Sequence, residues 1–427
     1  MISLVLPDGR GLGGVTTWAI DLVERSTGEP NPVRLIEHSP DDGIFHEHST
    51  RDHRESPHPN DPRLRSADVA HFARRYNTGT EAQLFVPNWS WGSHAAAAAT
   101  LQTNPNARVL GFVHADGQDY YDWISYYEPT MTRIVAVSEE IAERLRRDLP
   151  HRSGDIDVLP YAVDCPPLRT RAARNDMINV VYAGRIAITQ KRVLDLVEVA
   201  RRLSQHDVDY RLRIIGDGPE EHALQREIDA LPVHVRSRIE RQPAVSPSQM
   251  VRVWGEADVL LLTSSHEGTS IAMLEAMASG VVPVVTSVSG TAALIENGVN
   301  GFTTSVGDTD RLAHRISELA SDRECLERMS HAAHQTMRER MTVTEYDAAL
   351  HAIATKCLEA PPPQLPDAWT HLPPARLRGD LGDALAMIRG DRDAAKKVLF
   401  RAAATPGVRW TLRAAPAAKR ILDRRRR

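Results

Sequence analysis

The chain has 427 residues, of which 42% are hydrophobic and 25% are charged, as in an ordinary water-soluble globular protein. One hydrophobic core rarely serves a chain of this length, so we expect two domains. The formal net charge of −4 gives no electrostatic reason to expect nucleic-acid binding, and no run of eighteen apolar residues is present to cross a membrane.

The cysteines and the N-terminus both point to a cytoplasmic protein. Cys165, Cys325 and Cys357 lie far apart and form no CxxC pair, so they predict neither a disulfide framework nor a zinc site. Residues 1–8 lack the basic start and the long apolar segment of a signal peptide.

Short apolar runs that read as strands alternate with longer amphipathic segments, and this alternation occurs twice. It predicts right-handed βαβ units and parallel sheets, hence an α/β fold. A polar, proline-containing stretch separates the two sets, so we predict domains at residues 1–165 and 176–358, and a Pro-rich, basic tail at 359–427. The predicted strands are residues 2–7, 33–37, 83–86, 109–113, 134–137 and 156–159 in the first set, and 179–183, 211–215, 259–262 and 282–285 in the second.

A glycine-rich loop follows the first predicted strand. From Gly9 to Gly14 it reads G-x-G-x-x-G, and Glu37 ends the second strand 23 residues after Gly14. This pattern is typical of dinucleotide-binding folds, which makes a nicotinamide-dependent oxidoreductase one alternative. Gly13 and Gly14 would equally let the backbone approach the phosphates of another nucleotide.

Residues 38–65 form a polar segment without periodicity that contains five histidines. Their spacings are irregular and no cysteine or fixed carboxylate accompanies them, so we interpret the segment as a solvated loop rather than a metal site. The histidines are His38, His46, His48, His53 and His58.

His114 follows the strand at residues 109–113, at the edge where open α/β sheets bind ligands. A lone histidine is more often structural than catalytic, and the position alone leaves both readings open. Nearby aromatic residues have two readings as well, because they either stack on a sugar ring or fill the core. They are Trp89, Trp91, Tyr120, Tyr121 and Trp123.

Two cations flank a predicted strand-to-helix loop in the second domain. Arg185 and Lys191 lie between the strand at 179–183 and a helix beginning near Lys191. Such a pair is suited to neutralising a diphosphate, although a basic loop in solvent has the same appearance. Gly216 lies in the next strand-to-helix turn.

The segment 257–302 carries the strongest pattern. Its strand runs into a loop at 264–269 and then into a helix that we expect to begin at Ser270 and to end at Gly280. Free amides at Gly268, Thr269 and Ser270, together with the helix dipole, would attract a phosphate. Glu267 and Glu275 either face a ligand at this edge or are surface charges beside an ordinary helix.

These motifs, in this order over most of residues 1–350, resemble the retaining glycosyltransferases of family 4. The resemblance implies a GT-B fold, in which two facing Rossmann-like domains form a central cleft. The second domain would hold most of the nucleotide-sugar donor, and the first would hold the acceptor.

The resemblance also implies a role for each candidate residue. Glu275 would hold the nucleotide ribose, Glu267 would contact the donor sugar, and the amides of Gly268, Thr269 and Ser270 would approach the sugar or the diphosphate. The remaining implied roles are a diphosphate clamp (Arg185 and Lys191), a turn beside the base (Gly216), a backbone turn near the donor phosphates (Gly13 and Gly14) and a contact near the reacting carbon (His114).

The sequence departs from the family pattern in two places. The usual Asn-Gly-Val-Asp turn is Tyr-Ala-Val-Asp at 161–164, and the usual Gly-Gly-x-x-Glu is Ser-Gly-Thr-Ala-Ala at 289–293, without the acid. The first puts the role of the interdomain turn in doubt, and the second removes a polar group near the donor.

We therefore expect a retaining, metal-independent enzyme of the hexosyltransferase class, because no Asp-x-Asp pair follows a predicted strand to bind a metal. It would need no cofactor beyond its UDP-, GDP- or ADP-linked sugar. The acceptor stays open among a glycan, a lipid-linked carrier and a small molecule. The alternatives are the oxidoreductase, a sugar-nucleotide epimerase of the same fold and a non-catalytic sugar-binding scaffold.

The end of the chain differs in charge from the rest. Residues 394–427 contain eleven Lys and Arg against one Asp, whereas the first 393 residues carry a formal charge of −14. Basic residues interleaved with Phe400 and Trp410 are suited to peripheral contact with an anionic membrane, and equally to a solvated tail.

Overall fold

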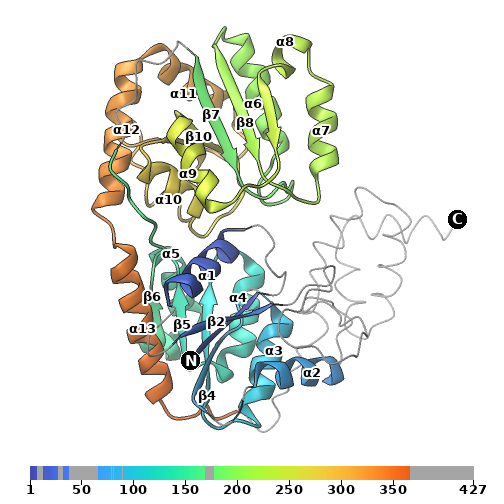
Figure 1. Cartoon of the computed structure of the whole chain (residues 1–427), viewed down its shortest axis with the longest axis vertical. Coiled ribbons are helices and arrows are strands. Elements are labelled where there is room, and N and C mark those ends of the chain that lie inside the picture. The colour runs from blue at the N-terminus through green and yellow to red at the C-terminus, as the bar shows by residue number, and fades with distance from the viewer. Residues whose placement is uncertain are drawn as a thin grey trace, which may run out of the picture.

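The computed structural model describes residues 1–6, 13–26, 32–37, 66–77, 79, 81–88, 90–168 and 177–365. They form two α/β domains, each built on a six-stranded sheet in which every pairing is parallel (Figure 1). The predicted fold of two Rossmann-like domains is confirmed. The five-histidine segment and the basic tail lie outside the described residues.

The first sheet has the strand order β2-β1-β3-β4-β5-β6. All seven residues of β4 are buried, as expected where helices cover both faces of a parallel sheet. The elements are β1 (Ile2–Leu6), α1 (Gly14–Arg25), β2 (Val33–Glu37), α2 (Ser66–Tyr76), β3 (Gln83–Val86), α3 (Trp91–Leu101), β4 (Ala107–Val113), α4 (Gln118–Tyr127), β5 (Arg133–Ala136), α5 (Glu139–Asp148) and β6 (Ile156–Val158), with 3₁₀ turns η1 (Glu128–Thr130) and η2 (Pro150–Asp155).

The second sheet has the order β12-β11-β10-β7-β8-β9. Sequence patterns missed its two edge strands, because one has a single apolar residue (IERQ) and the other is three residues long. The elements are β7 (Ile178–Ala183), α6 (Leu194–Gln205), β8 (Tyr210–Ile215), α7 (Glu221–Asp229), α8 (Val233–Arg236), β9 (Ile239–Gln242), α9 (Pro247–Glu256), β10 (Val259–Leu262), α10 (Ile271–Ala278), β11 (Val282–Thr286), β12 (Phe302–Thr304), α11 (Thr309–Ser321), α12 (Arg323–Arg338) and α13 (Val343–Glu359).

The last helix, α13, returns to the first domain (Figure 1). It packs against β3 and β4, and its buried Tyr346 hydroxyl accepts a hydrogen bond from Trp18 Nε1 of α1 at 2.8 Å. Arg25 forms a two-pronged ion pair with Asp347 at 2.8 and 2.9 Å. These contacts place the last helix of the second half of the chain on the N-terminal domain.

The two domains also touch at the carboxyl ends of their central strands. Ala115, just after β4, pairs as an isolated antiparallel bridge with Gly268, just after β10. The Asp116 amide donates to the Glu267 carbonyl at 3.4 Å. A Cβ at position 268 would lie 1.8 Å from the His114 carbonyl oxygen, so this approach requires a glycine.

No helix in the described part of the chain is both long and apolar enough to cross a lipid bilayer.

Tyr346→Phe should lower the free energy of unfolding by about 1–3 kcal/mol, because it leaves the buried Trp18 N–H without its acceptor. Urea unfolding followed by circular dichroism measures this. Arg25→Met, which removes the more exposed ion pair to Asp347, should cost less than about 1 kcal/mol. An equal or larger loss in Arg25→Met would contradict the view that the buried bond anchors α13.

Gly268→Ala should separate the two domains, because the added methyl cannot occupy the space of the His114 carbonyl. Small-angle scattering should give a larger radius of gyration, and the Asp116 amide should exchange its hydrogen faster. Gly154→Ala is the matched control, since a Cβ there meets no atom within 4 Å. Unchanged scattering and exchange in Gly268→Ala would show that the contact is dispensable.

Candidate active site

Two side chains at the carboxyl edge of the second sheet converge on one carboxylate oxygen of Glu267. Lys191 Nζ lies 2.6 Å from Glu267 Oε1, and the Ser264 hydroxyl donates to the same oxygen at 2.6 Å. Glu267 is buried, with 5% of its surface exposed. A buried carboxylate is stable only when it is paired and hydrogen-bonded, and both conditions hold here.

The loop that carries Lys191 is fixed by the loop that carries Glu267. Thr263 Oγ1 donates to the Lys191 carbonyl at 2.8 Å, and Ser265 bonds the carbonyls of Thr189 and Gln190. The Lys191 ammonium therefore reaches its position from a backbone that is already held in place. Such preorganisation is what a site for developing negative charge requires.

Arg185 lies in the same loop but behaves differently. Its side chain is exposed, while its carbonyl accepts a hydrogen bond from Tyr182 at 2.7 Å. The structure thus places both predicted clamp residues on one loop, with Lys191 in contact with Glu267 and Arg185 at the surface.

Glu275 lies on α10, and its Oε2 accepts a hydrogen bond from the indole N–H of Trp254 at 3.1 Å. Burial raises the pKa of Glu275 to about 6; the Trp254 bond opposes this shift, and the charge of Asp21 on α1 adds to it. Asp21 belongs to the first domain. Glu275 therefore lies close enough to the domain junction for a charge of the other domain to act on it.

The start of α10 forms as expected. The Ser270 hydroxyl accepts from the Met273 amide, which makes Ser270 the N-cap, and Gly280 follows the helix with φ +73°. Thr269 Oγ1 donates across the junction to the Val137 carbonyl at 3.3 Å. The amides at Gly268, Thr269 and Ser270 therefore lie at a capped helix N-terminus that faces the first domain.

The turn that lacks the family's acid supports this loop instead. Gly290 has φ +75°, and a Cβ there would lie 1.4 Å from the Gly268 carbonyl oxygen. The segment 289–293 therefore packs its backbone directly beneath Gly268.

His114 is buried, and protein groups occupy both of its ring nitrogens. Asn88 donates through Nδ2 to the Val5 carbonyl, so its Oδ1 accepts the His114 Nε2–H at 2.9 Å. Nδ1 then accepts from the hydroxyl of Tyr161. Burial lowers the pKa of His114 to about 3, with nearby His94 contributing. In this arrangement the ring is neutral and has no nitrogen left for a ligand.

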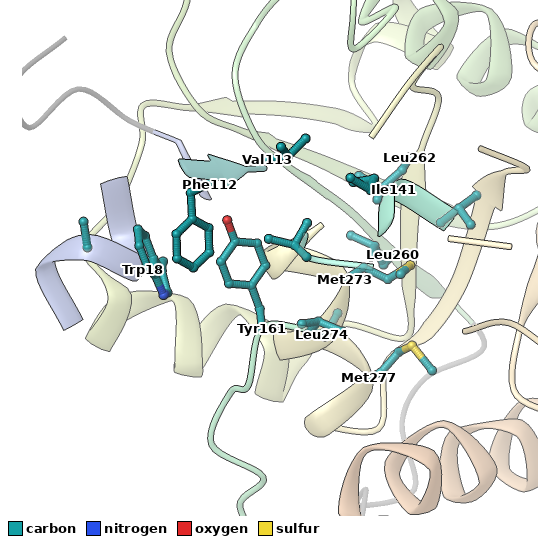
Figure 2. Packing of buried hydrophobic residues seen from close by; sticks show 14 of the residues in the cluster. Trp18, Phe112, Val113, Ile141, Tyr161, Leu260, Leu262, Met273, Leu274 and Met277 are labelled. Carbon is teal, nitrogen blue, oxygen red and sulfur yellow. The ribbon is translucent and has the colours of Figure 1, made fainter. Parts of the chain in front are cut away.

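The surroundings of His114 are aromatic. Trp18 lies 5.1 Å from Phe112 and 6.0 Å from Tyr161 between ring centroids, and Figure 2 shows these three rings gathered beside the end of β4. Tyr161 is the residue that replaces the family's usual asparagine. The departure from the family pattern therefore provides a hydroxyl that fixes His114.

The other predicted aromatic residues divide into two groups. Trp91 and Tyr121 are buried, and the Tyr121 hydroxyl donates to Asp116 at 2.7 Å, so these two belong to the core. Tyr120 and Trp123 are half-buried on α4, with ring centroids 5.9 Å apart. Trp89 lies outside the described residues.

The glycines of the predicted phosphate turns lie at the start of a helix and at the end of a strand. Gly13 precedes α1 and Gly14 begins it, while residues 7–12 of that loop lie outside the described residues. Gly216 has φ +140°, and a Cβ there would lie 1.9 Å from the Gly184 carbonyl oxygen. The turn after β8 thus packs backbone against backbone on the loop after β7, which carries Arg185 and Lys191.

Sequence reasoning missed four side chains that position the predicted ones: Asn88, Tyr161, Trp254 and Ser264. Only Tyr161 carried a signal, as a departure from the family pattern.

Two family profiles match the two domains separately. The profile described as Glycosyltransferase Family 4 matches residues 12–165, and the one described as Glycosyl transferases group 1 matches residues 178–322.

Curated relatives match over parts of their lengths. N-acetyl-alpha-D-glucosaminyl L-malate synthase of Bacillus anthracis is 29% identical over 38% of this chain and 42% of that protein. The putative colanic acid biosynthesis glycosyltransferase WcaL of Salmonella typhimurium is 34% identical over 33% and 36%. Glycogen synthase of Mycobacterium tuberculosis is 25% identical over 57% and 58%. The matched part is less than two thirds of each of these relatives.

Solved structures extend the likeness to the whole fold. Anabaena HepE in complex with UDP-glucose superposes with a TM-score of 0.63 over 83% of this chain and 99% of that one, at 14% identity. The lipopolysaccharide outer core galactosyltransferase WaaB gives 0.59 over the same shares, at 19% identity. With matching profiles across both domains and the observed fold, the chain belongs to glycosyltransferase family 4 and has the GT-B architecture.

Proposed function

We propose that the chain is a retaining glycosyltransferase that moves a sugar from a nucleotide-sugar donor to an acceptor hydroxyl. One observation carries the proposal: the half-buried Lys191 pairs with the buried Glu267, whose carboxylate also accepts from Ser264 and whose carbonyl meets the Asp116 amide of the first domain. Both groups reach that point from preorganised loops at the carboxyl ends of parallel strands, which is where open α/β sheets bind nucleotides.

The donor would lie along the second domain. Glu275 would accept the ribose hydroxyls, the turn at Gly216 would lie beside the base, and the amides at Gly268–Ser270 would meet the diphosphate. Arg185 and Lys191 would complete the charge compensation, and Gly13 and Gly14 would approach the phosphates from the first domain. These roles rest on family membership combined with the positions of the strand ends.

In the proposed reaction the bond between the anomeric carbon and the diphosphate oxygen breaks, and a bond from that carbon to the acceptor oxygen forms on the same face. The acceptor's proton passes to the departing phosphate oxygen, which leaves with the bond's electron pair. Lys191 stabilises the charge that accumulates on this oxygen, and Glu267 orients Lys191 while contacting the sugar. In this proposal the side-chain cations, rather than a metal ion, would stabilise the negative charge on the departing diphosphate.

His114 would act through its position rather than as an acid or base. Its neutral ring is fixed by Asn88 and Tyr161, and its carbonyl abuts Gly268. We therefore propose that the backbone of residues 114–116, rather than the His114 ring, lies near the reacting carbon. This backbone contacts Glu267 and Gly268.

The acceptor class stays a proposal. The relatives are named as an N-acetyl-alpha-D-glucosaminyl L-malate synthase, a putative colanic acid biosynthesis glycosyltransferase and a glycogen synthase, and one related structure holds UDP and glucose. A glycan or a small hydroxylated molecule fits these names, and a lipid-linked carrier remains the third candidate. A sugar-nucleotide epimerase of the same fold would alter or release the donor without forming a new glycosidic bond.

Lys191→Met and Arg185→Met should each lower turnover by roughly a hundredfold or more, because each removes a donor that meets the developing charge. The assay follows release of nucleoside diphosphate from UDP-, GDP- and ADP-sugars, with and without a panel of acceptors. Lys191→Arg keeps a cation for Glu267 and is the control for folding, together with the thermal midpoint of each variant. Near-normal rates in both Met variants would show that Arg185 and Lys191 do not neutralise the diphosphate.

The new glycosidic bond should keep the anomeric configuration of the donor. Proton NMR of the product reports this through the coupling constant of the anomeric proton. Inversion would exclude the proposed mechanism, and release of nucleotide with an altered free sugar alone would favour the epimerase.

A further inference from the structure

We infer that Trp254 positions the Glu275 carboxylate for the nucleotide ribose, and thereby sets the preference of the site for ribonucleotides. The inference rests on the proposed function, in which Glu275 binds the ribose. It names a residue that makes no contact with the ligand itself.

The position of Trp254 is fixed by the core of the second domain. It lies in the last turn of α9, with only 2% of its surface exposed, next to buried Val253. The other end of α9 is held by a capping box between Ser246 and Gln249. An indole has a single N–H donor, and this one points at Glu275 Oε2 at 3.1 Å. The carboxylate therefore meets a donor whose location does not depend on the ligand.

Because of this bond, the two carboxylate oxygens of Glu275 have different surroundings. With Oε2 held by the indole, Oε1 has no hydrogen-bond partner among the described residues and is the oxygen left for the ligand. Glu275 lies five residues after the N-cap Ser270, about 7.5 Å along the helix axis. The same helix therefore presents amides for phosphate at its start and a fixed carboxylate for a diol farther along.

The electrostatic surroundings of Glu275 oppose its ionisation, and the Trp254 bond acts against them. Burial raises the pKa of Glu275 to about 6, and Asp21 across the junction adds to the rise. Asp21 itself interacts with Arg25, Glu24 and Asp164. The Trp254 N–H favours the ionised carboxylate, which accepts hydrogen bonds from both ribose hydroxyls, whereas a protonated carboxyl accepts poorly.

The test compares UDP with 2′-deoxy-UDP by calorimetry at pH 7.5, or the corresponding pair of whichever nucleoside diphosphate binds. Wild-type protein should prefer the ribonucleotide by about tenfold, and Trp254→Phe should reduce this preference to about twofold. Glu275→Gln should reduce it as well. Trp91→Phe is the matched control, because Trp91 is a buried tryptophan of the other domain whose N–H has no hydrogen-bond partner among the described residues.

A second readout is the pH profile of nucleotide affinity. Affinity in wild-type protein should fall as pH drops through about 6, where Glu275 becomes protonated. In Trp254→Phe the fall should begin at higher pH, because the ionised carboxylate has lost its donor. Glu275→Gln should retain only the titration of the ligand's own phosphate, which makes it the reference curve.

If Trp254→Phe keeps both the ribose preference and the pH profile while Glu275→Gln loses them, the inference is wrong and the ribose role of Glu275 stands. If Glu275→Gln keeps the preference, the proposed ribose site itself fails. A thermal midpoint identifies a Trp254→Phe protein that has not folded. In that case, incorporation of benzothienylalanine at position 254, which keeps the shape but lacks the N–H, gives the same comparison.

Discussion

The contact between the backbone after β4 and the backbone after β10 governs how this site forms. Parallel sheets present the carboxyl ends of their strands at one edge, and here two such edges meet with Ala115 paired to Gly268. No side chain separates the two backbones at that point, so residues from both domains surround the same small region. Gly268, supported from below by Gly290, is the position that permits this approach.

Two glutamates of one short segment are stabilised in different ways. Glu267 is held by a cation and a hydroxyl, so its charge is compensated inside the protein. Glu275 is held by a neutral indole, so burial dominates and its pKa rises. The first arrangement suits a group that organises a neighbouring cation. The second suits a group whose charge is completed by the hydroxyls of a ligand.

The sequence predicted the parts of this molecule that depend on local patterns. The ten apolar runs became strands and Ser270 caps its helix, because alternation and capping depend on neighbouring residues. The edge strands β9 and β12 escaped because edge strands need little apolar surface. The bonds from Trp254 to Glu275, and from Asn88 and Tyr161 to His114, join residues 21 to 47 positions apart, and no spacing rule anticipates them.

One helix that packs on the first domain comes after the whole second domain in the chain. The sheet of the first domain is completed by residue 158, but the helix that packs on β3 and β4 arrives only at residues 343–359, after the whole second domain. During synthesis the ribosome therefore completes the strands of the first domain long before the helix that covers part of their apolar surface. A fragment that ends at the domain junction would lack α13, so the apolar surface that this helix covers on β3 and β4 would be exposed to water.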